Sequence, residues 1–550
     1  MIKSTKSLCS LTLLAAALPL MAQDKAPQKT TTTTTTTIES PEKKPASPPA
    51  DSTTEGTVST GGKTIAYKAV AGLLTVGSSD KQDAMIGLDG KYLPDAAIDL
   101  PSKVEDQPAT SRMFYTAYFA KGVDETTRPI TFVYNGGPGS ATMYLRMTSF
   151  GPVRVVLPDL DHPAGGPYRV VTNDNRCLLD ATDLVFIDAP GTGYSRVEGA
   201  NALKAFYGID EDAHAFDRFI RRFLTKYDRW QSPKFLFGES YGTTRDAVLS
   251  ADLQQSGVDL NGVIFLSQIL GFSNSADSSN SNLGVDNGYF LALPSFAATA
   301  WYHHKVPNQP ATLEPWIHEV ENYALTGYAE ALLKGTDLTS QEKAAVAAKL
   351  EGYTGIPAAT WVKANLRITG GEFSKLLQDN ADITTGRLDS RYEGPALDPM
   401  DNTAEYDPFT ESIDSSILAA MNMYAHNTLH YGENMTYKPS AREPGWSWDM
   451  KHSQGWGGDG GTPNVSGDIA QVMKVNTKMH VLLMGGYFDL GTLYFAGEYE
   501  MKHMGLPQSL VGNIEYKYFP TGHMVYVNPD AAQQLHDTTA AFIKAHETGN

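Results

Sequence analysis

Residues 233–245 read Pro-Lys-Phe-Leu-Phe-Gly-Glu-Ser-Tyr-Gly-Thr-Thr-Arg, a short apolar run followed by Gly-x-Ser-x-Gly and a segment compatible with a helix. This order predicts a strand, a sharp turn and a helix. At such a turn the serine takes a strained backbone conformation, and the two glycines let the helix and a neighbouring strand approach without a Cβ clash. We therefore predict that Ser240 stands exposed above the carboxyl end of a β-sheet.

A nucleophilic serine needs a base, a group that orients the base, and hydrogen-bond donors for the oxyanion. Residues 135–140, Asn-Gly-Gly-Pro-Gly-Ser, follow the apolar strand pattern of residues 130–134. That is the position of the loop that supplies an oxyanion-hole N–H in α/β-hydrolases. We predict that the backbone N–H groups of Gly137 and Tyr241 are the two donors.

Two further strand patterns end in residues that suit the other roles. Residues 479–488 lead to Asp489, and residues 516–519 are followed shortly by His523. The chain order Ser240, Asp489, His523 is that of the α/β-hydrolase fold and differs from the orders in other serine protease folds. We predict His523 as the general base and Asp489 as the acid that orients it.

Nearby residues leave alternatives for both roles. The competing acids and histidines are Glu498, Glu500, His480 and His503. A position at a strand end favours Asp489, and the strand and glycine before His523 favour that histidine.

These motifs, together with Asp-Ala-Pro-Gly-Thr-Gly-Tyr-Ser at residues 188–195, resemble the serine carboxypeptidase family from about residue 128 to about residue 535, with a variable middle. The resemblance implies an α/β-hydrolase fold and cleavage of C-terminal residues from peptides through an acyl-enzyme. It also implies that Asn135 and Glu239 hold the terminal carboxylate of the substrate. The second acid of the family is Ser149 here, so a paired acid clamp cannot form in that way. A structural alternative for Glu239 is an acid neutralised by a neighbour such as Arg245.

The remaining patterns predict an α/β fold with a mostly parallel central sheet, antiparallel N-terminal strands and a large inserted cap. Helical patterns at 210–227, 290–302, 316–334 and 340–350 accompany buried-strand patterns at 182–188 and 262–266. We divide the chain into a signal peptide (1–22), a disordered Thr/Pro-rich tether (23–62), the first part of the core (63–272), the cap (273–475) and the second part of the core (476–546).

The first residues are basic and then apolar over a stretch too short to span a bilayer, as in a secretory signal peptide. We therefore expect a periplasmic or extracellular protein. Loss of Lys3 and Lys6 with the signal takes the formal charge from −18 to −20, which disfavours nucleic-acid binding. The mature chain would keep only Cys177, so no intramolecular disulfide can form. The cysteine that follows Gly-Pro-Gly in the family is Ser140 here, which suggests a bacterial branch.

We predict neither a metal nor an organic cofactor, because the chain contains no His-Glu-x-x-His, no cysteine pair and no Gly-x-Gly-x-x-Gly between a strand and a helix. The expected partner is a peptide with a free C-terminus, with no nucleic acid and no membrane insertion after signal removal. An esterase or aminopeptidase on the same fold is the alternative enzyme, which Ser149 supports. A surface binding protein with a decayed site is the alternative of another class.

Overall fold

The structure is a computed structural model that describes residues 49–277, 283–442, 446–452 and 462–548. These residues belong to one structural unit. The predicted signal peptide, residues 1–22, lies outside the described residues, and so does the predicted tether up to residue 48.

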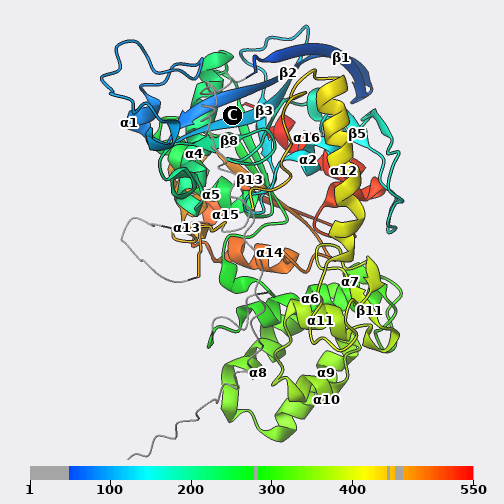
Figure 1. The fold of residues 1–550 in the computed structure, drawn as a ribbon. Helices are drawn as coiled ribbons and strands as arrows, with labels where there is room; N and C mark the ends of the chain where they lie inside the picture. Colours follow the sequence, from blue (N-terminus) through cyan, green and yellow to red (C-terminus); the bar gives the residue numbers. More distant parts are fainter. Residues whose placement is uncertain (1–48, 278–282, 443–445, 453–461, 549–550) are drawn as a thin grey trace, which may run out of the picture. The chain divides into compact units, whose positions relative to one another are not determined.

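A mostly parallel sheet forms the centre of this unit (Figure 1). Within the described residues it has ten strands, in the order β1-β2-β3-β7-β4-β9-β10-β13-β14, with β8 beside β3. Strands β7, β4, β9, β10, β13 and β14 run parallel, whereas β1, β2, β3 and β8 are antiparallel to their neighbours. This topology confirms the predicted fold class. The strands are β1 (Ser52–Thr60), β2 (Lys63–Gly77), β3 (Thr110–Ala120), β4 (Ile130–Tyr134), β7 (Asp183–Ile187), β8 (Arg196–Glu198), β9 (Lys234–Glu239), β10 (Gly262–Leu266), β13 (His480–Gly486) and β14 (Ile514–Phe519).

Strand β1 corrects the predicted end of the tether at residue 62. It pairs with β2 along its whole length, from Ser52↔Ala71 to Thr60↔Lys63. The turn between the two strands is Gly61-Gly62, and both glycines have positive φ, as two-residue hairpin turns require. The prediction failed because it weighed only the lack of apolar residues, whereas pairing with β2 satisfies the backbone of a Thr/Ser-rich strand.

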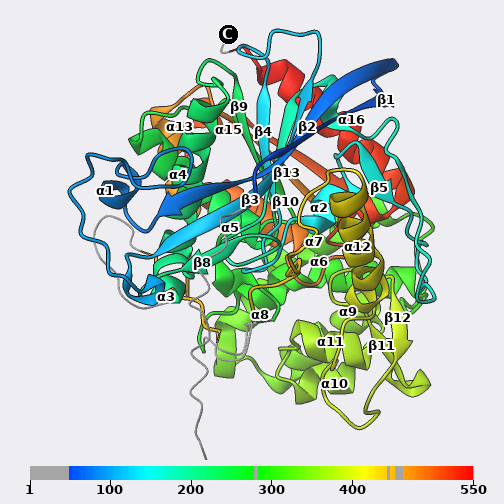
Figure 2. The ribbon, with the colours of Figure 1, turned by 45° about the horizontal axis from the view of Figure 1, so that its top comes forward.

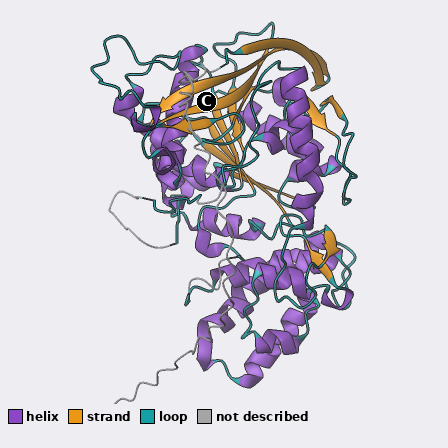
Figure 3. Ribbon diagram, viewed as in Figure 1, coloured by secondary structure: helices purple, strands orange, loops and turns teal. Residues whose placement is uncertain are grey.

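Helices cover both faces of the sheet (Figures 2 and 3). One layer shares a buried hydrophobic cluster with the sheet and consists of α4 (Ile209–Lys226), α5 (Tyr241–Gln255) and α13 (Ser466–Val475). The opposite layer consists of α2 (Met143–Thr148), α12 (Pro408–Asn427) and α16 (Pro529–His546). Helices α12 and α13 fall inside the range predicted as the cap, yet they pack on the core.

Six helices within the predicted cap share a separate hydrophobic cluster and lie beside one another in Figure 1. They are α6 (Asn287–Tyr302), α7 (Leu313–Tyr323), α8 (Ala329–Lys334), α9 (Ser340–Thr354), α10 (Ala358–Lys363) and α11 (Gly370–Leu376), with a π-helical turn at Ala324–Tyr328. Phe488 and Leu490, which follow β13, belong to the same cluster. The cap core therefore encloses the loop that carries Asp489.

Short elements complete the unit. They are α1 (Asp80–Asp83), α3 (Ala202–Phe206), α14 (Tyr494–His503), α15 (Gln508–Val511), and the strand pairs β5 (Val153–Val155) with β6 (Val170–Thr172) and β11 (Ile383–Thr385) with β12 (Glu393–Pro395). In the part of the chain that the structure describes, no helix is both long enough and apolar enough to cross a membrane.

The two glycines of Gly-x-Ser-x-Gly lie where β9 meets α5. A Cβ on Gly238 would stand 2.3 Å from the Asp246 carboxylate and 2.3 Å from the Gly242 carbonyl oxygen. A Cβ on Gly242 would stand 3.1 Å from the carbonyl oxygen of Tyr134 on the adjacent strand β4. The close approach of α5 to β9 therefore depends on Gly238. The close approach of α5 to β4 depends on Gly242.

Gly238→Ala should lower the free energy of unfolding by about 1–3 kcal/mol or more, because the methyl group meets backbone that cannot move aside. Urea denaturation followed by circular dichroism measures the effect. Gly352→Ala in α9 is the control, since a Cβ there meets nothing within 4 Å. That change should stabilise by about 0.4–1 kcal/mol. Equal midpoints for the two variants would contradict the packing argument.

Candidate active site

The backbone at Ser240 has φ 60° and ψ −129°, a conformation that non-glycine residues adopt only under strain. Its N–H donates to the carbonyl of Leu266 at the end of β10 (3.0 Å), and its carbonyl accepts from the Thr243 N–H (2.9 Å). Residues 234–239 and 241–251 are buried, whereas Ser240 is partly exposed. The turn thus leaves Ser240 partly exposed between two buried segments.

Two backbone N–H groups near Ser240 are available to an anion. Among the described residues, no group accepts a hydrogen bond from the N–H of Gly137 or of Tyr241. A Cβ on Gly136 would stand 2.4 Å from the Tyr241 nitrogen, so the loop after β4 lies directly against the start of α5. Free N–H groups at the positive end of a helix can stabilise an oxyanion.

His523 and Asp489 are buried and in contact, with 2.7 Å between Nδ1 of the histidine and Oδ2 of the acid. The other carboxylate oxygen, Oδ1, accepts from the N–H groups of Gly491 (2.8 Å) and Thr492 (3.0 Å). The Thr492 hydroxyl donates to Asp489 Oδ2 (2.7 Å). These contacts hold the acid in place and favour the tautomer in which His523 carries its proton on Nδ1.

Strand β10 connects the serine turn to the histidine loop. Leu266 accepts the N–H of Ser240, and the hydroxyl of the next residue, Ser267, donates to the carbonyl of His523 (2.7 Å). Ser240, Asp489 and His523 also follow the carboxyl ends of the parallel strands β9, β13 and β14. The sheet therefore brings the three predicted residues to one edge.

The cap contributes three backbone hydrogen bonds that sequence reasoning missed. The carbonyl of Leu388 accepts from the N–H of His523 (2.6 Å), and the carbonyl of Arg387 accepts from the N–H of Leu490 (2.9 Å). The Ser390 N–H donates to the Phe488 carbonyl (2.9 Å). Residues 387–390 therefore bind both the acid loop and the base loop. No side-chain pattern marks such a segment, because carbonyl and amide groups occur at every position.

The competing residues are engaged elsewhere. The Glu500 carboxylate accepts from Gln268, Asn274 and the backbone N–H groups of residues 270 and 271. Glu498 accepts from Lys502 and from the Tyr518 hydroxyl, and the ring of His503 contacts the carbonyl of Tyr499, whereas His480 stacks on His546. The geometry therefore favours Asp489 and His523 over all four.

Glu239 is buried beside Ser240, and each oxygen of the Glu239 carboxylate accepts a hydrogen bond. The Tyr526 hydroxyl donates to Oε1 (2.8 Å), and the amide of Asn135 donates to Oε2. The Asn135 side-chain oxygen accepts the Leu145 N–H (3.0 Å), which fixes the amide orientation. Tyr526 was missed by sequence reasoning, because it shares no motif with Glu239.

Arg245 does not neutralise Glu239. Its guanidinium pairs with the buried Asp212, with 2.6 Å between Nε and Oδ2, and donates to the backbone carbonyl of Asn135 (3.0 Å). Ser149, in the position of the second acid of the family, donates its hydroxyl to the Leu145 carbonyl (2.6 Å). Neither residue therefore supplies the charge partner of Glu239.

Burial raises the pKa of Glu239 to about 7, although the His523 charge and the hydrogen bonds from Tyr526 and Asn135 oppose the rise. Burial lowers the pKa of His523, whereas the Asp489 carboxylate and, to a smaller extent, Glu239 raise it. The rise is the larger effect, so the pKa of His523 lies above its ordinary value. The protonation of Glu239 and that of His523 are therefore coupled.

The strand order of the sheet and the strained serine between β9 and α5 define an α/β-hydrolase fold. Similar solved structures include the peroxisomal α/β-hydrolase Lpx1 of Saccharomyces cerevisiae (11% identity, TM-score 0.31, covering 86% of this chain and 89% of that one). A soluble variant of monoglyceride lipase from Saccharomyces cerevisiae is also similar (10% identity, TM-score 0.30, 83% and 98%). The fold assignment rests on the strand order, because these TM-scores are low.

Residues 103–276 match the family model for serine carboxypeptidases. A carboxypeptidase Y homolog of Arthroderma benhamiae is 28% identical over 159 residues, 28% of this chain and 29% of that protein. The pheromone-processing carboxypeptidase KEX1 of Yarrowia lipolytica is 32% identical over 144 residues, 25% of this chain and 21% of that protein. The chain thus spans less than a third of the length of these relatives. The resemblance to serine carboxypeptidases is confirmed over the segment that contains Ser240.

Ser240→Ala should abolish labelling by a fluorophosphonate and lower the turnover of a simple ester by about a thousandfold or more, because the covalent route is lost. Mass spectrometry of the labelled protein and a spectrophotometric ester assay measure the two effects. Ser340→Ala, at the exposed start of α9, is the control and should behave as wild type. A Ser240 variant that still takes up the label would assign the nucleophile to another residue.

Asp489→Asn should slow ester hydrolysis by about a thousandfold or more, because the amide can hold the imidazole of His523 in the unproductive tautomer. Glu500→Gln is the matched control, since Glu500 is also a buried acid but contacts Gln268 and Asn274. We expect nearly wild-type turnover from it. If Glu500→Gln slowed the reaction and Asp489→Asn did not, Glu500 would be the acid that orients His523.

Proposed function

We propose that the protein is an exported serine-type carboxypeptidase that removes C-terminal residues from peptides. Ser240 Oγ attacks the carbonyl carbon of the last peptide bond while His523 takes the hydroxyl proton. The N–H groups of Gly137 and Tyr241 stabilise the resulting oxyanion. His523 then gives the proton to the departing amino acid, which leaves an acyl-enzyme. Water, deprotonated by His523, attacks that ester and releases the shortened peptide and the free serine.

The buried Glu239 beside the nucleophile is the observation that carries the exopeptidase proposal. An ionised acid at this position would oppose the oxyanion, so a general hydrolase gains nothing from it. A carboxyl group with a pKa of about 7 is protonated at mildly acidic pH and can then donate a hydrogen bond to a substrate carboxylate. The Asn135 amide, which already contacts Glu239, is the second donor that we assign to this carboxylate.

The proposed location and domain roles rest on the sequence. The basic and apolar residues 1–22 support export to the periplasm or the extracellular space. Residues 387–390 of the predicted cap (273–475) bind the loops that follow β13 and β14, which supports a role for the cap in shaping the substrate pocket.

An esterase or aminopeptidase on the same fold is the second candidate. The observation in its favour is Ser149, whose hydroxyl bonds to the Leu145 carbonyl and leaves Glu239 without a second acid from that position. A binding protein with a decayed site is less well supported, because the contacts among Asp489, Thr492 and His523 are those of a working base.

The hydrolysis of peptides with a free C-terminus should peak at mildly acidic pH. As pH rises through about 7, Glu239 loses its proton and repels the substrate carboxylate. On the acidic side, hydrolysis falls as His523 becomes protonated, and its raised pKa brings this limb closer to neutrality. Esters and C-terminally amidated peptides should lack the alkaline fall in kcat/KM. Profiles of kcat/KM against pH for the two substrate types measure the difference.

Glu239→Gln should change both limbs of these profiles. The alkaline fall for free-carboxyl peptides should flatten, because glutamine does not titrate. The acidic limb should move to lower pH for esters and amidated peptides, whose hydrolysis tolerates an ionised Glu239, because that charge no longer raises the pKa of His523. Glu500→Gln removes another buried acid with a pKa of about 7 and should leave the profiles unmoved. Identical profiles for free and amidated peptides, unmoved by Glu239→Gln, would favour the esterase.

A further inference from the structure

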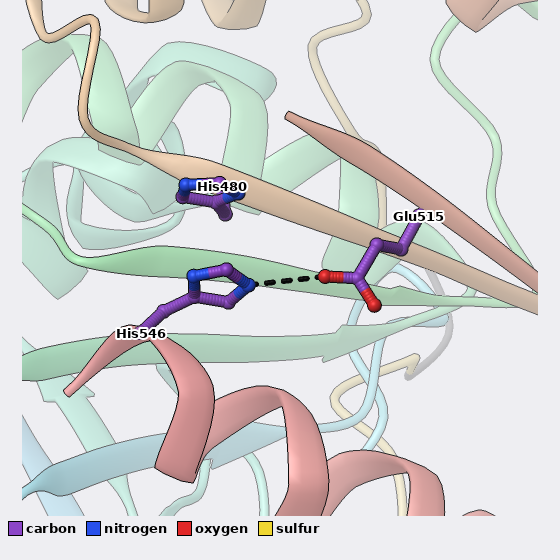
Figure 4. Close-up of side chains that lie close together, drawn as sticks. All are labelled: His480, Glu515 and His546. Carbon is purple, nitrogen blue, oxygen red and sulfur yellow. Dashed lines mark hydrogen bonds and ion pairs between the residues drawn. The ribbon is translucent and has the colours of Figure 1, made fainter. Parts of the chain in front are cut away.

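Three side chains capable of binding a metal meet at the amino edge of the parallel strands, opposite the edge that carries Ser240 (Figure 4). His480 is the first residue of β13, Glu515 is the second residue of β14, and His546 is the last residue of α16. One potential ligand atom from each residue lies within 4.8 Å of the other two. Nε2 of His546 is 3.0 Å from Oε1 of Glu515, and the two imidazole rings stack with centroids 3.7 Å apart.

The sheet register explains why these residues converge. Glu515 is paired with Leu482, two residues after His480, so the histidine and the acid point to the same face of the sheet. Helix α16 covers that face, and its Phe542 ring packs against Phe235 on β9. The His546 carbonyl accepts from the Asn261 amide (3.1 Å), which fixes the end of the helix beside β10. Three separately anchored elements therefore hold the three ligands.

His480 is the residue that ordinary packing explains least. Its Nδ1 is buried and has no hydrogen-bond partner among the described residues. An imidazole with an unused nitrogen can bind a metal ion, and the Glu515 carboxylate lies beside it.

We propose that His480, Glu515 and His546 bind one zinc ion that joins α16 to strands β13 and β14. Two imidazole nitrogens and a carboxylate oxygen are ligand types that zinc accepts, whereas calcium and magnesium require mainly oxygen ligands. The rings must turn out of their stack to bring each nitrogen to about 2.0–2.1 Å from the ion. The site is remote from Ser240, so the ion acts on the anchoring of the C-terminal helix. No spacing motif marks these residues, which is why the sequence predicted no metal.

Zinc titration of chelator-stripped protein at pH 7.5, followed by isothermal calorimetry, tests the proposal. We expect about one equivalent of tight binding and a higher midpoint of thermal unfolding with zinc, but no comparable response to calcium. His480→Gln, Glu515→Gln and His546→Gln should each weaken binding at least about tenfold, since even changes outside the ligand shell can cost that much. His503→Gln is the control, because that histidine is exposed on α14, where its ring contacts the carbonyl and the ring of Tyr499 and takes no part in the cluster.

Three further measurements keep the outcomes distinct. Circular dichroism checks that each variant folds, and the half-exposed Glu515 is the change least able to disturb the core. The titration is repeated on His523→Gln, which removes the candidate catalytic histidine as a zinc ligand. Ester hydrolysis should survive chelation, so failure of the zinc site and failure of the proposed peptidase activity are separable. Absence of binding, or an isotherm unchanged in His480→Gln and Glu515→Gln, would overturn the proposal.

Discussion

The close approach of α5 to β9 at Ser240 is the constraint on which the rest of the site depends. There is no room for a Cβ at Gly238 against α5 or at Gly136 against the Tyr241 nitrogen. Because the chain passes from strand to helix without an intervening loop, Ser240 takes a positive φ, and no described group accepts the N–H of Tyr241, the first residue of α5. The candidate nucleophile and one candidate oxyanion donor, the Tyr241 N–H, therefore depend on the same packing contact.

Several charged side chains are buried around Ser240. Arg245 on α5 and Asp212 on α4 compensate each other, so Arg245 holds the Asn135 carbonyl without adding net charge near Glu239. Among the described residues, no lysine or arginine pairs with Glu239, and burial raises its pKa to about 7. A proton on this acid and a neutral His523 are both needed for the proposed reaction, and each group influences the titration of the other.

The predicted cap contacts both loops that carry the candidate acid and base. Its hydrophobic cluster includes Phe488 and Leu490 on either side of Asp489, and the Leu388 carbonyl binds the His523 N–H. Movement of residues 387–390 would therefore displace the acid and the base together. In the proposed reaction, this coupling would let the predicted cap act on the orientation of His523.

The sequence by itself determined the elements whose signals are local. The apolar run of β10 was predicted at the residues where it is observed, and the glycine spacing around Ser240 and the chain order of Asp489 and His523 marked the candidate triad. Tertiary structure alone decided the contacts between distant residues. Tyr526 and Glu239, which form a hydrogen bond, are 287 positions apart. Strand β1 forms because its backbone pairs with that of β2. Such contacts follow from sheet register and helix docking, which no residue spacing along the chain encodes.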